Sequence, residues 1–221
     1  MITPGSGASS FISTPWPNQT FYGPTWPPIG ETFLLVVSIL SPTATVTAIS
    51  DNDLNSYSKI AGYANTAGGF SVEIWKATVT ATASWTAILV QISAFCLFSV
   101  ALQTYDGVSS IGNISAQSSG NGAVLHAPVI QLQDGGNFAV GLIACISASS
   151  TYFAGTDGST LRQAAIGVFA GAGCGIIDRQ SRTVAKVQSI ASLTIAQYWT
   201  MFAVELRTGV KLYESQAQFI D

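Results

Sequence analysis

The sequence predicts an all-β protein, an antiparallel sandwich of two sheets with a jelly-roll-like arrangement. Three observations favour it. Short apolar or alternating segments recur along the chain, clusters of Gly, Asn, Asp and Ser such as 106–113 and 118–122 separate them, and no stretch has the capped, charged face of a surface helix. A length of 221 residues suits one large β domain, which needs neither disulfides nor metal to stay folded.

The expected strands begin after Glu31. Residues 32–40 form a short buried run that ends before Pro42. Further strands are expected at 44–50, 70–80, 84–105 (long enough for two), 123–133, 137–148, 160–170, 174–190 and 193–207. Many of these segments are apolar on both faces, which predicts two packed sheets whose outer faces are covered by a neighbouring molecule.

Residues 1–30 differ from the rest, because they contain six of the eight prolines and no charged side chain. Proline disfavours helices and central strands, so we expect an extended arm followed by a sandwich domain at 31–207 and a short tail at 208–221. The arm either wraps its own domain or docks on a neighbouring subunit. Its candidate contact residues are the large aromatics Phe11, Trp16, Phe21, Tyr22 and Trp26.

The segment 70–80 predicts where Trp75 lies. Successive side chains of a strand point to opposite faces, so Phe70, Val72 and Ile74 share one face and Glu73 and Trp75 share the other. The uniformly apolar set predicts the core between the sheets. We therefore expect Trp75 on the outer face, covered by the arm or by a neighbouring subunit. A bulge that shifted the parity would bury it between the sheets instead.

Composition limits the classes of partner. Charged residues make up 9% of the chain, against about 25% in an average soluble protein, and the mean hydropathy is +0.41. Such a chain is expected to bury apolar surface against copies of itself or a larger assembly. The net charge is −3 and the one basic cluster (Arg179, Arg182, Lys186) is too small to predict nucleic-acid binding.

Membrane insertion and secretion are not expected. The longest apolar run, 87–102, is shorter than the ~20 residues of a spanning helix and is interrupted by Gln91, Ser93 and Ser99. The first residues have neither the basic nor the apolar region of a secretory signal, which suits synthesis in the cytoplasm. The three cysteines fit no metal or disulfide spacing, so buried reduced thiols are expected.

No catalytic, metal or cofactor-binding residue is expected, and we predict that the chain is not an enzyme. Asp51, Asp53 and Asn55 resemble the start of a calcium loop, but Ser56 and Gly62 stand where that loop needs Gly and Glu. An Asx turn is the favoured interpretation. The single histidine, His126, has no nucleophile motif near it in sequence. A sugar-stacking face is a further alternative, with Trp85, Tyr198 and Trp199 as its aromatics.

Several short motifs together resemble a known module. They are Asp51, Asn52, Asn55 and Tyr57; Val72, Ile74, Trp75 and Ala77; Tyr105, Gly107 and Val108; Gly158, Thr160, Leu161 and Arg162; and a closing strand at Trp199. Across residues 33–207 the chain resembles a jelly-roll-like β-sandwich module that recurs in virion proteins of tailed phages. The family usually has Gly where this chain has Leu54.

The resemblance implies a structural role without catalytic residues or cofactors. With the low charge and the aromatic arm, it leads us to expect a capsid decoration (cement) protein on the outer surface of a phage head. The expected partners are its own copies, as a homotrimer, and the major capsid protein or other virion subunits. Alternatives are a neck or tail fibre component, or a carbohydrate-binding adhesin module.

Overall fold

A computed structural model describes residues 2–12, 17–23, 27–80, 87–133, 137–147, 153–156, 158–165, 171–181 and 185–208. Within these ranges the chain forms seventeen strands and no helix. The prediction of an all-β antiparallel sandwich is confirmed. Among the described residues no helix is long and apolar enough to cross a membrane, and the apolar run 87–102 forms parts of two strands.

The first main sheet has five strands. Its order is β1-β8-β3-β6-β5, and all neighbours are antiparallel. The strands are β1 (Thr3–Ile12), β3 (Thr32–Ile39), β5 (Ser58–Asn65), β6 (Phe70–Thr78) and β8 (Phe98–Asp106). A smaller sheet with the order β2-β7-β4 accompanies it, built from β2 (Asn18–Tyr22), β4 (Val46–Asp51) and β7 (Ala87–Ile92).

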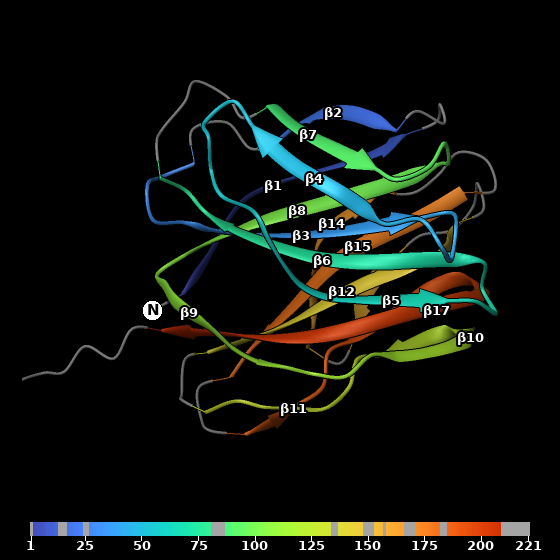
Figure 1. The fold of residues 1–221 in the computed structure, drawn as a ribbon. Coiled ribbons are helices and arrows are strands. Elements are labelled where there is room, and N and C mark those ends of the chain that lie inside the picture. The colour runs from blue at the N-terminus through green and yellow to red at the C-terminus, as the bar shows by residue number, and fades with distance from the viewer. Residues whose placement is uncertain are drawn as a thin grey trace, which may run out of the picture.

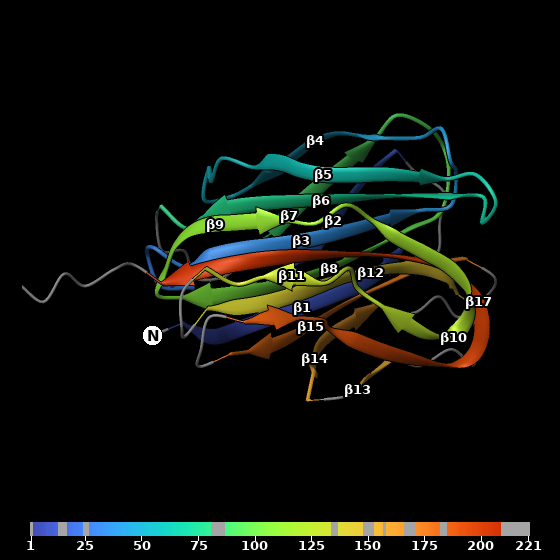
Figure 2. The same ribbon diagram turned by 90° about the horizontal axis from the view of Figure 1, so that it is seen from below.

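The second main sheet has seven strands, all of which follow residue 107. Its order is β10-β17-β12-β15-β14, and β9 and β13 also pair with β17. The strands are β9 (Val108–Ile114), β10 (Ser118–His126), β12 (Phe138–Ser147), β13 (Phe153–Thr156), β14 (Thr160–Ala165), β15 (Gly171–Gln180) and β17 (Ile190–Thr208). The short strands β11 (Ile130–Gln131) and β16 (Lys186–Val187) pair with each other. Figure 2 shows β17 crossing the width of the molecule and bending beside β10.

The four sheets are stacked as layers. In Figure 1 the three-stranded sheet lies above the five-stranded sheet, the seven-stranded sheet follows below, and β11 lies at the bottom. Three apolar clusters fill the spaces between the layers. The outer faces of the two main sheets are thus covered by the chain itself. This corrects the expectation that a neighbouring molecule is needed to cover them.

Strand β3 shows why the apolar runs have no polar face. All eight of its residues are buried. Leu34 and Val36 belong to the cluster between the main sheets, whereas Leu35 and Val37 belong to the cluster beneath the three-stranded sheet. Complete burial of a side chain of this size contributes about 1.5–3 kcal/mol, so alternate residues of β3 stabilise two different interfaces.

The N-terminal segment differs from the expected arm. Residues 3–12 form β1, which pairs with β8, and Ile2 is buried in the main core. The prolines do not prevent this, because Pro4 lies on an edge strand beside a register shift and Pro17, Pro27 and Pro28 lie outside strands. In their described part, residues 1–30 therefore belong to the sandwich, and the expectation that they lie outside it is corrected. The residues after Thr208 lie outside the described part.

The predicted parity of β6 is confirmed. Phe70, Val72 and Ile74 face the seven-stranded sheet, and the half-buried Trp75 packs on the opposite cluster. Its cover comes from the chain's own three-stranded sheet, which includes Phe21 from β2. Next to it the buried Glu73 carboxylate accepts a hydrogen bond from the indole Nε1 over 3.0 Å and pairs with Lys59 at 2.9 Å.

Candidate functional site

The loop after β4 is organised by the carboxylate of Asp51. One oxygen, Oδ1, accepts hydrogen bonds from the backbone N–H groups of Asp53 (3.1 Å) and Asn55 (2.9 Å). The other, Oδ2, accepts from the Asn55 side chain (2.9 Å) and from the hydroxyl of Tyr57 (2.6 Å). These bonds confirm the Asx-turn interpretation. Burial, followed by this bond to Asp51, raises the pKa of Tyr57, which keeps its hydroxyl protonated as a donor.

The same loop is tied to its surroundings by amide side chains. The Asn55 Oδ1 accepts from the N–H and the hydroxyl of Thr80, at 2.8 and 3.0 Å, and the Asn52 Oδ1 accepts from the N–H of Ala87 at 2.7 Å. Because the Asp51 oxygens already accept four hydrogen bonds, the calcium hypothesis gains no support. No group of three or more potential metal ligands comes together in the described part of the chain.

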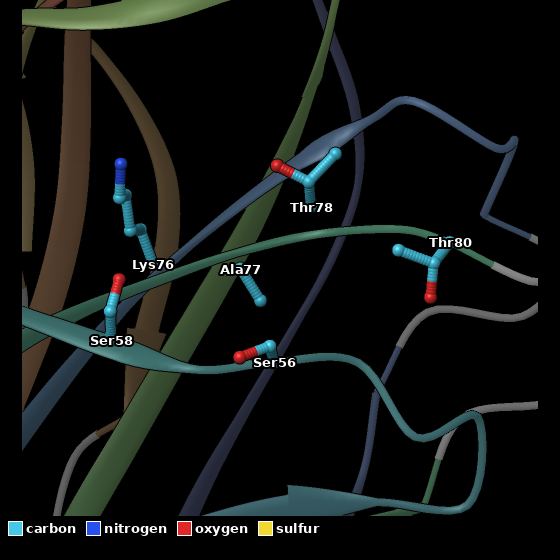
Figure 3. A pocket seen from close by; sticks show the side chains of 6 residues that line it. All are labelled: Ser56, Ser58, Lys76, Ala77, Thr78 and Thr80. Atoms are coloured by element: carbon cyan, nitrogen blue, oxygen red, sulfur yellow. The ribbon is translucent and has the colours of Figure 1, made fainter.

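A small polar hollow lies beside this loop (Figure 3). It has a volume of about 210 Å³, and hydroxyl side chains and one lysine line it. Ser58 of β5 lies opposite Lys76 of β6, and Figure 3 shows the two side chains pointing to the same side while Ala77 points to the other. The hollow offers hydrogen bonds to a small polar molecule. Among the described residues no hydrogen bond joins the Ser58 hydroxyl to the Lys76 amino group, so the two do not form an activated nucleophile.

Two of the sequence motifs meet at Asp178, a residue that the sequence did not single out. Tyr105 of β8 donates to its Oδ2 over 3.1 Å, and Arg162 of β14 donates through Nε to the same oxygen over 2.7 Å. The Asp178 side chain is 2% exposed and Tyr105 is fully buried. Burial, and then the charge of Asp178, raises the pKa of Tyr105 well above its ordinary value.

The glycines of these two motifs have a conformational reason. Gly107 and Gly158 have φ values of +72° and +76°, in the left-handed region that residues with a Cβ rarely adopt. They form the turns that follow β8 and precede β14. The motifs therefore position Tyr105 and Arg162 on opposite sheets, where both reach Asp178. This cluster joins the two main sheets through polar bonds.

Another buried carboxylate lies in the same sheet as Asp178, on the opposite face. Glu205 of β17 is fully buried and its Oε1 accepts from the N–H of Gln133 (2.6 Å) and the side chain of Asn137 (2.8 Å). Its Oε2 accepts from the N–H of Asn113 (3.1 Å) and from Arg207 Nε (3.2 Å). Burial alone would raise its pKa, but these donors together lower it.

The six predicted assembly contacts are dispersed. Phe21 is buried in the core and Trp75 is half-buried, whereas the Tyr22 side chain is 59% exposed. The side chain of Phe11 and the whole of Trp16 and Trp26 lie outside the described residues. The structure therefore leaves Tyr22 as the one described member of the set that is exposed.

The other sequence candidates do not form a reactive site in the described part of the chain. His126 is an exposed residue at the end of β10, opposite Ile190. Cys145 and Cys174 are buried free thiols, and Cys96 is partly exposed. Of the aromatics considered for sugar stacking, Trp199 is buried, Tyr198 is 38% exposed and Trp85 lies outside the described residues.

Comparison with known proteins adds no relative. No protein-family model, no curated protein and no solved structure matches the sequence. The resemblance to the phage virion module therefore rests on the short motifs alone. What the structure contributes is a physical role for those motifs, because Asp51, Tyr105 and Arg162 each form polar contacts that join separate elements.

Proposed function

We propose that this chain is a structural subunit of a virion: a decoration (cement) protein that, as a homotrimer on the outer capsid surface, stabilises a phage head through contacts with the major capsid protein. The proposal rests on one observation. The chain uses its acidic side chains internally and exposes large apolar side chains. A neck or tail fibre subunit would need the same surface.

The acidic side chains illustrate the first half of this observation. Of the seven acidic residues in the described part, only Asp106 is exposed. The buried ones are Glu31, Asp51, Asp53, Glu73, Asp178 and Glu205. Burying a carboxylate costs several kcal/mol unless donors satisfy it, so most of these groups hold loops and sheets together. The described surface therefore carries little negative charge, and the electrostatic repulsion that would oppose association with other proteins is weak.

The exposed apolar residues illustrate the second half. Leu54, Phe95, Ile29 and Tyr22 are 88%, 71%, 66% and 59% exposed. Three of them lie at one end of the five- and three-stranded sheets. Tyr22 pairs with Ala87, the Asn52 N–H donates to the same Ala87 two residues before Leu54, and the Gly30 N–H next to Ile29 donates to Val79. We call Tyr22, Ile29 and Leu54 the apolar end. Exposed apolar surface of this kind commonly marks a protein interface.

The test is the mass in solution together with particle binding. Light scattering behind a sizing column should give three times the chain mass of 23.0 kDa. Leu54→Asp should reduce this mass to that of one chain, and Val129→Asp should not, because Val129 is similarly apolar and 55% exposed but belongs to the other half of the chain.

Binding to particles distinguishes the proposal from its alternatives. The full chain is added to phage heads stripped of their decoration protein, and the heat resistance of the shell is measured. The proposal expects saturable binding and a more stable shell. A chain that is monomeric at all concentrations and binds no shell would overturn it, and saturable sugar binding by such a monomer would favour the adhesin alternative.

A further inference from the structure

A hollow of about 380 Å³ lies beside Asp178. Residues 2–4, at the start of β1, form one wall, and β14 and β15 form the other. Arg162 lines it from β14, and Asp178 and Arg179 line it from β15. The charged groups of its described lining are thus two cations and one anion. All of its described lining comes from one chain, so the site does not depend on the proposed function.

Arg162 is held in this hollow by a buried anchor. Its Nε donates to the Asp178 Oδ2 over 2.7 Å, and Tyr105 binds the same oxygen from the opposite sheet. The register of β14 against β15 shifts between Leu161 and Gln163, so Arg162 is the extra residue of a bulge. Bulges redirect a side chain, and they occur often next to functional sites. The anchored guanidinium is therefore fixed in direction before any ligand arrives.

Most of the donors of this guanidinium are unused. A guanidinium has five N–H donors, and the bond to Asp178 uses the one on Nε. No described residue accepts a hydrogen bond from Nη1 or Nη2 of Arg162, and the side chain is 30% exposed. Four donors thus remain available on a side chain that lines the hollow.

These features specify the chemical class of a ligand. A planar fork of donors matches a planar carboxylate and binds it through two parallel hydrogen bonds. The nearby Asp178 carboxylate repels a phosphate dianion more strongly than a carboxylate monoanion. We infer that the hollow is a carboxylate-binding site in which Asp178 positions Arg162 and Arg162 binds the ligand. The carboxylate belongs either to an acidic protein side chain or to a free small acid.

The inference is tested with acetate as the smallest carboxylate. The ¹⁵N NMR signal of the Arg162 Nε–H, assigned by its loss in Arg162→Lys, is followed while acetate replaces chloride at constant ionic strength. A saturable shift with a millimolar Kd is expected. A shift that is linear, or that chloride produces equally, would overturn the inference.

Variants distinguish specific acetate binding from general effects of charge. For each variant the Kd for acetate is obtained from the backbone amide signals of residues 160–163, at a temperature below the melting temperature of that variant. Arg162→Lys retains the charge but loses the fork, so the affinity should fall about tenfold. Arg207→Lys is the matched control, because Arg207 is also held through Nε on a buried carboxylate (3.2 Å) and is 27% exposed, yet does not line this hollow. It should leave the affinity unchanged. Equal losses in both variants would contradict the inference.

A third variant keeps Arg162 intact. Thr160 lines the hollow, is exposed, and lies two residues before Arg162 on β14. Thr160→Glu supplies a carboxylate from within the chain and should therefore abolish acetate binding, whereas unchanged binding would count against the site. Glutamate capped at both ends distinguishes the two sources. If it binds as well as acetate, an acidic protein side chain fits; if only acetate binds, the site takes a free small acid.

Discussion

The hydroxyl of Tyr105 on β8 lies 3.1 Å from the carboxylate of Asp178 on β15, so one hydrogen bond crosses the core between the two main sheets. The Tyr105 ring also contacts that of Phe138, with 6.1 Å between ring centroids. Apolar packing alone permits two sheets to slide against each other. A buried polar bond with one allowed geometry fixes their relative position.

Removal of this bond should destabilise the protein. Tyr105→Phe keeps the ring and deletes the hydroxyl, and we expect the free energy of unfolding to fall by about 1–2 kcal/mol. Urea denaturation measures the change. Tyr63→Phe is the control, because Tyr63 packs on the same core and its hydroxyl has no partner among the described residues. Equal effects of the two variants would show that the bond to Asp178 contributes nothing.

Leu54 should be replaceable by glycine with a gain in stability. It has a φ of +59°, the only positive value among the described non-glycine residues, and its side chain is 88% exposed. A Cβ in this conformation costs about 1 kcal/mol, and little area buried within a single chain is lost with the side chain. At a protein concentration at which the chain is monomeric, Leu54→Gly should raise the urea midpoint, whereas Leu54→Ala, which keeps the Cβ, should not. A gain with both variants would point away from backbone strain.

Glu205 should make the free energy of unfolding depend on pH in the acidic range. Its pKa is lower in the folded protein than in the unfolded chain, so the ionised carboxylate stabilises the fold above the ordinary glutamate pKa of about 4.3. This contribution is lost as the pH falls through the folded value. Glu205→Gln should cost about 2 kcal/mol at pH 7, since its NH₂ would face donors, and the difference from wild type should shrink near pH 3. A difference independent of pH would contradict the charge argument.

Glu31 should show the opposite dependence. Its side chain is buried, its Oε2 has no partner in the described part of the chain, and burial, with a smaller effect of Asp106, raises its pKa despite the bond with Thr104. A raised folded pKa means that folding favours the protonated form, so stability falls as the pH rises through that value. Glu31→Gln should therefore be more stable than wild type at pH 8 but not at pH 4. The melting temperatures of the two proteins at pH 8 and pH 4 test this prediction, and an equal difference at both pH values would contradict it.

The cysteines should differ in reactivity. Cys145 and Cys174 are fully buried, and burial raises the pKa of Cys174 to about 12 and that of Cys145 as well. Only Cys96 is partly exposed. A thiol reagent at pH 8 should modify one group per folded chain and three in denaturant. Rapid modification of all three in the folded protein would indicate that the core opens.

Local sequence patterns predict those features that depend on neighbouring residues, but not those that depend on contacts between distant segments. Alternation predicted the faces of β6, and the spacing of Asp51 and Asn55 predicted the Asx turn, because both depend on neighbours in sequence. The small outer sheets and the pairing of β1 with β8 depend on distant segments, for which proline content was a poor guide. Asp178 had no local signal, since its importance comes from Tyr105 and Arg162, each contributed by a different strand.

The two main sheets are built from successive parts of the chain, and this order determines when each sheet can form during translation. Every strand of the five-stranded sheet precedes residue 107, so this sheet can form while the rest of the chain is still being translated. The other main sheet cannot, because β9, β10, β12 and β13 all pair with β17, which follows all four of them in the chain. Until the ribosome releases residues 190–208, these strands expose unpaired edges that can aggregate. A truncation within β17 should therefore leave the inner apolar face of the first sheet uncovered and the strands of the second sheet unpaired, so that the truncated chain aggregates.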